Sequence, residues 1–191
     1  IGPNGAGKST LFHLISGLLR PSSGTIHLDS RPIQGMDPQR INRLGLARSF
    51  QITNVFPGLS VFETLRLGVM RRHKLDYNFW RPASRATAVT AEVDVLLENV
   101  RLSGQRDTLA GELSYSEQRS LEIGIALASD PSVLLLDEPM AGMSREETDY
   151  TTGLIKELSQ GRSLMIVEHD MDVVFSLSDR ISVLVYGQII A

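Results

Sequence analysis

The sequence contains no cysteine, and no apolar run in it approaches the roughly 18 residues needed to cross a bilayer. The first absence excludes disulfides and metal sites built on thiolates, and the second excludes a membrane-spanning helix. Basic residues are not in excess either: the formal net charge is -3, which gives no support for a nucleic-acid-binding domain. An initiator methionine is also missing, because the chain opens at Ile1, and we expect it to be cut from a longer protein at both ends.

What is present is typical of one globular domain. The 191 residues are enough for one domain with a substantial buried core and few for two. Their apolar share of 42% and charged share of 21% are ordinary for a folded protein. We therefore treat residues 1–191 as a single domain.

Short apolar runs alternate with longer segments of helical periodicity. Buried strands are predicted at residues 133–136, 164–167 and 181–185, and a helix is predicted from Lys8 onward. The apolar face of this helix is expected to consist of Leu11, Leu14, Ile15 and Leu18. Such alternation indicates an α/β fold with a mostly parallel sheet.

The strand signals fade in the middle of the chain. Between Gln51 and about Leu113, two helices are predicted, at residues 61–70 and 87–100. This pattern indicates a helical insertion into the sheet domain.

The first residues match the phosphate-binding pattern G-x-x-x-x-G-K-[ST], and the predicted helix follows directly, as this motif requires. Glycines let the backbone curl so that its N–H groups point at phosphate oxygens. Lys8 is suited to reach the terminal phosphates, and the Ser9 hydroxyl is suited to Mg²⁺. The alternative is a glycine-rich turn with a capping serine. The predicted nucleotide-binding residues are Gly2, Pro3, Asn4, Gly5, Ala6, Gly7, Lys8, Ser9 and Thr10.

A second feature is an apolar strand that ends in two carboxylates, Asp137 and Glu138. Asp137 suits the Mg²⁺ shell, because this ion prefers hard oxygen ligands, and Glu138 suits a base that polarises the attacking water. Two acids after a strand are, on their own, more often a solvated loop entrance, but beside a phosphate loop they indicate hydrolysis. His169, just after the strand at 164–167, is interpreted as a sensor of the terminal phosphate, with a structural histidine as the alternative.

A third segment lies shortly before the acidic strand, and the order of the motifs resembles the ATP-binding cassette (ABC) ATPases. The segment is the family's signature sequence, here Leu113, Ser114, Tyr115, Ser116 and Glu117. The ordered set covers nearly the whole chain: phosphate loop, Gln51, signature, acidic strand, the turn at 141–144, and Glu168-His169-Asp170. The resemblance implies a P-loop NTPase fold with a RecA-like core at residues 1–50 and 113–191. Residues 51–112 would hold the Q-loop, named after Gln51, and the helical subdomain.

The resemblance also implies how such a domain works. Two domains bind two molecules of ATP with Mg²⁺ at their interface, and each phosphate loop faces the signature of its partner. Glu138, His169 and Gln51 are then the catalytic residues, and Ser9, Gln51 and Asp137 are the metal ligands. The alternative for Ser114 is a helix cap, because Ser114 and Glu117 have the spacing of a capping box, and the two roles are compatible.

Three positions depart from the family pattern. Tyr115 and Ser116 replace the two glycines usual in the signature, and the Cβ of Ser116 is expected to strain the backbone or to narrow the phosphate site. Ser144 stands where an Asp is common, and it too has the spacing of a capping box.

The stretch from Phe50 to Glu63, with the signature and the segment after residue 166, resembles the ATPase subunits of branched-chain amino acid importers and urea importers. This implies a peripheral protein on the cytoplasmic face of the plasma (inner) membrane, with permease subunits and, through them, a solute-binding protein as partners. A coupling helix of the permease would dock beside Phe56, Leu59 or Phe62, residues that alternatively pack the insertion.

Rival interpretations are a urea or other small-solute importer and a soluble ABC ATPase that acts on ribosomes or DNA. The latter proteins carry two cassettes or long coiled coils, and neither occurs within these 191 residues. A switch that binds nucleotide without hydrolysis is disfavoured, because the set needed for hydrolysis is present.

Overall fold

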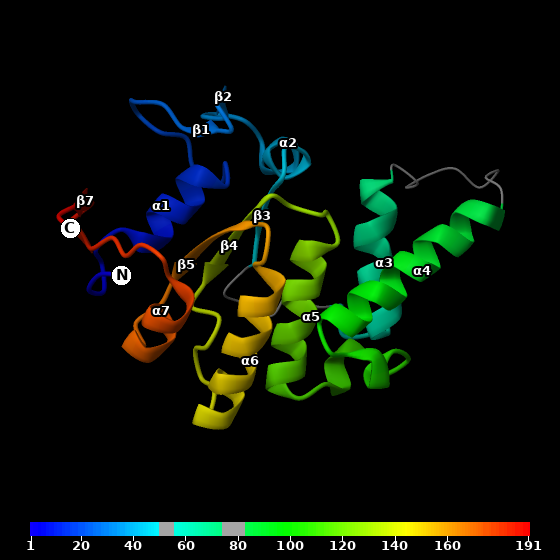
Figure 1. Ribbon diagram of the computed structural model, residues 1–191. Coiled ribbons are helices and arrows are strands. Elements are labelled where there is room, and N and C mark those ends of the chain that lie inside the picture. Colours follow the sequence, from blue (N-terminus) through cyan, green and yellow to red (C-terminus); the bar gives the residue numbers. More distant parts are fainter. Residues whose placement is uncertain (50–55, 74–82) are drawn as a thin grey trace. The chain divides into compact units, whose positions relative to one another are not determined.

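The computed structural model describes residues 1–49, 56–73 and 83–191, with only the backbone for residues 83–86, and the chain forms two compact units (Figure 1). The sheet unit consists of Ile1–Gln51 and Ser132–Ala191, and the helical unit consists of Ile52–Pro131. The second boundary differs from the one expected at residue 112. The helix that follows the signature packs on the other helices of the helical unit, which is why it belongs there.

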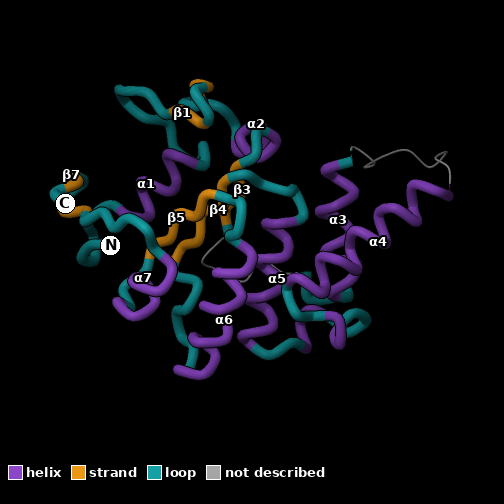
Figure 2. The backbone as a smooth tube through the Cα atoms, in the orientation of Figure 1, coloured by secondary structure: helices purple, strands orange, loops and turns teal. Residues whose placement is uncertain are grey.

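Three parallel strands form the centre of the sheet unit, in the order β3 (Leu46–Arg48), β4 (Val133–Asp137) and β5 (Ser163–Val167) (Figure 2). Leu46 pairs with Val133, and Asp137 pairs with Val167. Because the strands run in one direction, their carboxyl ends meet at one edge of the sheet, where ligands bind in α/β proteins. The predicted α/β fold and the strands at 133–136 and 164–167 are confirmed.

Helices and two short hairpins complete the sheet unit. They are α1 (Lys8–Ile15), β1 (His27–Leu28), β2 (Arg31–Pro32), α2 (Pro38–Arg43), α6 (Arg145–Leu158), α7 (Met171–Leu177), β6 (Leu184–Val185) and β7 (Gln188–Ile189). The strand predicted at 181–185 is shorter than expected: β6 has two residues and pairs antiparallel with β7. The turn between them places Tyr186 and Gly187 at positive φ, as tight hairpin turns require.

The helix after the phosphate loop packs through a different residue from those predicted. The one fully buried side chain of α1 is Phe12, and it packs in one core with Ile41 of α2 and with Leu135 and Val167 of the sheet. Leu18 is 47% exposed and lies beyond the helix, because the chain leaves the helical conformation at Gly17, where φ is 78°. The predicted apolar face is therefore wrong at Leu18, while Ile15 packs against the edge of the core.

The helical unit contains the two predicted helices, both longer than expected, and a third. Its elements are α3 (Val61–Arg72), α4 (Ala83–Asn99), the 3-10 turns η1 (Ser103–Gln105) and η2 (Ala110–Glu112), and α5 (Tyr115–Leu127). A glycine allows α3 and the end of α5 to approach closely, since a Cβ on Gly68 would lie 2.6 Å from the Cβ of Ala128. The helices in the part of the chain that the structure describes are too short or too polar to cross a membrane.

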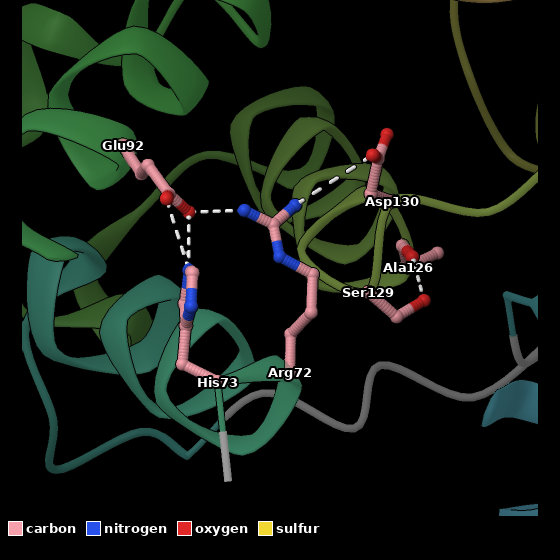
Figure 3. Close-up of polar contacts among 6 residues, drawn as sticks. All are labelled: Arg72, His73, Glu92, Ala126, Ser129 and Asp130. Carbon is pink, nitrogen blue, oxygen red and sulfur yellow. Dashed lines mark hydrogen bonds and ion pairs between the residues drawn. The ribbon is translucent and has the colours of Figure 1, made fainter. Parts of the chain in front are cut away.

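A cluster of charged groups connects the end of α3 with the middle of α4 and with the residues after α5 (Figure 3). Arg72, at the end of α3, lies between Glu92 of α4 and Asp130 after α5, with its Nη1 3.9 Å from the Asp130 Oδ2. His73 Nε2 lies 2.9 Å from the Glu92 carboxylate. The groups are partly exposed, so each pair contributes little to stability, but together they link the end of α3 to the middle of α4.

Candidate functional site

The phosphate loop leads directly into α1 and is backed by the hairpin of β6 and β7. The Gly187 N–H donates to the Ala6 carbonyl at 2.9 Å, and the Leu184 N–H donates to the Ile1 carbonyl at 2.9 Å. A Cβ on Gly2 would lie 2.2 Å from the Leu184 carbonyl oxygen, so this position requires glycine. The hairpin therefore fixes the course of the loop.

Gly7 is the N-cap of α1 and has φ of 102°, in the left-handed region where a side chain would be strained. Since glycine has no side chain, it does not cap the first-turn N–H groups, and Ser9 and Thr10 are exposed beside them. The Lys8 ammonium lies over the loop and donates to the carbonyls of Gly2 at 2.6 Å and Pro3 at 3.0 Å. Amide donors, a helix N-terminus and an ammonium together form an anion site.

Asp137 ends β4 with its side chain only 1% exposed. Arg48, at the end of β3, places its Nη2 3.0 Å from the Asp137 Oδ2, which compensates the buried charge. Phe12 of α1 packs in the same core as Leu135, two residues before Asp137. The acidic strand end therefore belongs to the same packed structure as the helix of the phosphate loop.

Glu138 is half-buried and has φ of 46°, an unusual conformation for a residue with a side chain. Its N–H donates to the Val167 carbonyl at 2.9 Å, and its carbonyl accepts from Ala141 at 3.1 Å. The chain thus turns sharply at the residue predicted to be the base, and hydrogen bonds on both sides hold the turn. Backbone strain of this kind concentrates at functional sites.

Glu168 follows β5 and connects two predicted site segments. Its Oε1 accepts from the Met140 N–H at 3.0 Å and its Oε2 accepts from the His169 N–H at 3.2 Å, while the side chain is fully buried. Burial raises the pKa of Glu168, the two backbone hydrogen bonds oppose this effect, and the nearby Glu138 raises it further. The His169 side chain is 72% exposed, so it is available to a ligand at this edge.

The signature lies in the helical unit and begins α5. Ser114 is the N-cap: its Oγ accepts from the Glu117 N–H, and the Glu117 carboxylate accepts from the Ser114 N–H at 2.8 Å. This confirms the predicted capping box. Tyr115 is 49% exposed, and Leu113 is buried and anchors the segment.

Ser116 occupies the first turn of α5, and its Oγ lies 3.4 Å from the Ser114 Oγ. Its φ is helical, since it lies in α5 and is not among the described residues with positive φ. A residue with a side chain adopts this conformation without strain. The expected backbone strain at Ser116 is therefore wrong, while a narrowed phosphate site stays a prediction. Ser144 caps α6 in the same way, with the Glu147 carboxylate 2.9 Å from the Ser144 nitrogen, which confirms the second capping box.

The three residues predicted to meet a permease differ in exposure. Phe56 is 57% exposed, whereas Leu59 and Phe62 are half-buried. The Arg106 guanidinium covers the Phe62 ring, 3.8 Å from its centroid. Only Phe56 of the three therefore presents most of its surface.

Gln51, predicted as a catalytic and metal-binding residue, lies outside the described residues, as does Phe50. Sequence reasoning missed the functions of Arg48 and Glu168 in this arrangement. An arginine at the end of an apolar strand and a glutamate directly before the predicted sensor histidine were the available signals. Neither signal indicates which residue is contacted, because Asp137 is 89 residues from Arg48 and Met140 is 28 residues from Glu168 in the sequence.

The sheet unit thus carries a loop with the donors of an anion site, a buried carboxylate, a second carboxylate at a strained turn and an exposed imidazole. Groups of these types are suited to binding phosphate and to activating water. The family model for ABC transporters matches residues 1–141. The high-affinity branched-chain amino acid transport ATP-binding protein BraF of Pseudomonas aeruginosa is 39% identical over 98% of this chain and 76% of its own length. The corresponding protein LivG of Escherichia coli is 36% identical over the same shares.

Solved structures agree with this result. An ATP-binding cassette of an ABC transporter covers the whole of this chain and 77% of its own, with a TM-score of 0.85 at 32% identity. A cassette structure in the ADP conformation has a TM-score of 0.84 at 31% identity, with the same coverage. The chain therefore belongs to the ABC transporter family and is an ATP-binding cassette ATPase.

Proposed function

We propose that this chain is the ATP-hydrolysing part of an importer for branched-chain amino acids. The observation that carries the proposal is identity over nearly the full chain to two transport proteins named for these solutes, at 39% and 36%. A relative named for putative ribose, galactose and methyl galactoside import is 33% identical over 96% of the chain, but this chain covers only 34% of it. Urea and other small solutes are the alternatives.

The residues present fit ATP with Mg²⁺. The phosphates would lie on the N–H groups at the start of α1, where Gly7 leaves the helix uncapped. The donors suited to the metal are the Ser9 hydroxyl and the Asp137 carboxylate, which are hard oxygen ligands. Among the described residues, no three His, Asp or Glu side chains gather into a site of their own, so phosphate oxygens and water would complete the shell. Gln51 is the third proposed ligand.

Each proposed residue has a role that follows from its place. Lys8 and the loop N–H groups hold and orient the phosphates, and when bound Mg²⁺ would neutralise charge on the phosphate oxygens. Glu138 accepts a hydrogen bond from the water that attacks the γ-phosphorus, so that the bond to the β-phosphate oxygen breaks and ADP and phosphate form. His169 donates to the γ-phosphate as charge develops, and Glu168 holds the backbone of His169 and of the turn after Glu138.

The position of the signature supports an enzyme that works as a dimer of two such chains. Ser114 and the first turn of α5 form a second helix N-terminus, exposed at Ser114 and Tyr115. We propose that this surface, residues 113–117, meets the γ-phosphate bound by a homologous partner subunit, so that hydrolysis requires a dimer. The capping box does not conflict with this role, because it uses the Ser114 hydroxyl and the Glu117 carboxylate and leaves Tyr115 exposed and Ser116 half-buried.

Permease subunits are the proposed membrane partners, on the cytoplasmic face of the inner membrane, with a solute-binding protein acting through them. Of the three residues expected to meet a coupling helix, Phe56 is the exposed one. In the same proposal, the sheet unit acts as the nucleotide-binding core and the helical unit as the transmitting region.

Transport in vesicles tests the proposal. The full-length subunit is reconstituted with the membrane subunits that co-purify with it, and uptake of labelled leucine is measured with ATP on the cassette side. We expect uptake that requires ATP and the solute-binding protein, and that Glu138→Gln abolishes. Uptake of urea or ribose without leucine would contradict the solute assignment, and ATP hydrolysis stimulated by ribosomes or DNA would favour the soluble class.

A further inference from the structure

Arg48 connects the two elements that carry the proposed metal ligands. Its Nη2 lies 3.0 Å from the Asp137 Oδ2, and its Nη1 lies 3.4 Å from the Ser16 Oγ of the residue that caps α1. Its guanidinium also stacks over the Phe12 ring of α1, 5.5 Å from the centroid. One side chain therefore contacts the end of β4 and the helix that begins with Lys8 and Ser9.

These contacts are buried. The Arg48 side chain is 6% exposed and the Asp137 side chain 1% exposed. In such an environment a carboxylate without a partner is strongly unfavourable, and its ion pair is held in one geometry. A guanidinium is planar and presents its donors in a fixed fork, so that fixing two of its contacts fixes the third.

We propose that Arg48 is a positioning residue for the metal half of the site. It holds the Asp137 carboxylate at a fixed place relative to α1, and hence relative to the Ser9 hydroxyl, so that both ligands meet one Mg²⁺ ion. The inference rests on the proposed metal role of Asp137. It adds that the planar geometry of the guanidinium, and not only its charge, sets the affinity for the metal. Residues that hydrogen-bond to metal ligands commonly affect metal affinity in this way.

The distinguishing variant is Arg48→Lys in the full-length protein. Lysine keeps the positive charge but has no fork that reaches Asp137, Ser16 and the Phe12 ring together. Mn²⁺ serves as the probe, and its affinity for the complex of protein and ATP is measured by electron paramagnetic resonance. We expect the dissociation constant of Mn²⁺ to rise about tenfold, the lower end of the range for partners of metal ligands. Arg43→Lys, at an exposed position in α2, is the matched control and should change nothing.

Two further measurements keep the outcomes distinct. Nucleotide binding without metal, which depends on the loop and Lys8, should be unchanged in Arg48→Lys and shows that the variant is folded. Asp137→Asn should also weaken Mn²⁺ binding, and adding Arg48→Lys to it should cause little further loss, because the two residues act through one contact. If Asp137→Asn leaves Mn²⁺ affinity unchanged, the proposed metal role of Asp137 is wrong. If only Arg48→Lys leaves it unchanged, the positioning role of Arg48 is overturned.

Discussion

At the scale of single residues, the phosphate loop depends on one ammonium group. Lys8 donates to two carbonyls of its own loop, at 2.6 and 3.0 Å, which places the charge over the loop that leads into the uncapped start of α1. Phosphate oxygens carry full charge and are stronger acceptors than carbonyls. The same side chain can therefore exchange loop carbonyls for a nucleotide with little reorganisation.

We predict that Lys8→Ala weakens binding of Mg-ATP at least tenfold, because a hydrogen bond between charged groups contributes about 1.5–3 kcal/mol. Titration of the full-length protein with a fluorescent ATP analogue measures the dissociation constant. Lys156→Ala, at an exposed position of α6, is the control for loss of one positive charge. Equal affinities of the wild type and Lys8→Ala would remove Lys8 from the site.

Glu168 leads to a prediction about pH. Because burial raises its pKa above the ordinary value of 4.5, the folded protein binds more protons than the unfolded chain from about pH 4.5 upward to the raised pKa. The contribution of Glu168 to stability is therefore greatest below pH 4.5 and is lost as the pH rises through the raised value. The midpoint of urea unfolding is measured from below pH 4.5 to above the raised pKa. We expect the stability of the wild type to fall with rising pH, and Glu168→Gln to remove part of this fall.

The matched control for this titration is Glu98→Gln, because Glu98 is exposed on α4. It should preserve the pH dependence of the wild type. If Glu168→Gln also preserves it, the titration of Glu168 does not contribute to stability.

At the scale of elements, the start of α5 combines two functions in a few residues. The capping box of Ser114 and Glu117 fixes the first turn, and Ser116 occupies a helical position in that turn. The departure from glycine at Ser116 therefore has no cost in backbone strain. What remains is the volume of a Cβ and a hydroxyl where the family signature commonly has none.

We predict that Ser116→Gly strengthens ATP-induced dimerisation, because it removes this volume from the surface proposed to meet the partner's phosphate. Light scattering of the full-length protein at increasing ATP concentration measures the change. Ser116→Ala is the matched control: it removes the hydroxyl but keeps the Cβ, and should resemble the wild type if the Cβ is the obstacle. Because glycine can cost up to about 1 kcal/mol of helix stability, the helix content of Ser116→Gly is measured by circular dichroism as well. With helix content unchanged, a dimer that is no stronger than the wild type would contradict the steric effect.

Local sequence patterns predicted the capping boxes and the central strands, but they could not predict contacts between residues far apart in the sequence. The capping boxes at Ser114 and Ser144 follow from residues three apart, and the strands β4 and β5 follow from continuous apolar runs. The buried face of α1 was predicted correctly at Ile15 but not at Phe12 and Leu18, because which residues are buried depends on what lies beneath the helix. The pair of Arg48 and Asp137 joins strands 89 residues apart, and only the order of strands in the sheet brings it together.

At the scale of the whole molecule, the proposed catalytic residues and the signature belong to different units. The loop, Asp137, Glu138 and His169 are in the sheet unit, and residues 113–117 are in the helical unit. In the proposed dimer, the sheet unit of one subunit and the helical unit of its partner enclose each ATP. Closure of the dimer would then depend on bound ATP, and hydrolysis of that ATP, with Glu138 as the base, would allow the dimer to open.

The central claim is that Glu138 drives hydrolysis of ATP in such a dimer. Phosphate release and retained ATP are measured together for the full-length wild type and for Glu138→Gln, with Glu146→Gln at an exposed position of α6 as control. The predicted result for Glu138→Gln is phosphate release at least about 100-fold slower, with ATP retained in a species of twice the monomer mass, because loss of a general base commonly slows catalysis by this much. Phosphate release from Glu138→Gln at the wild-type rate would contradict the account.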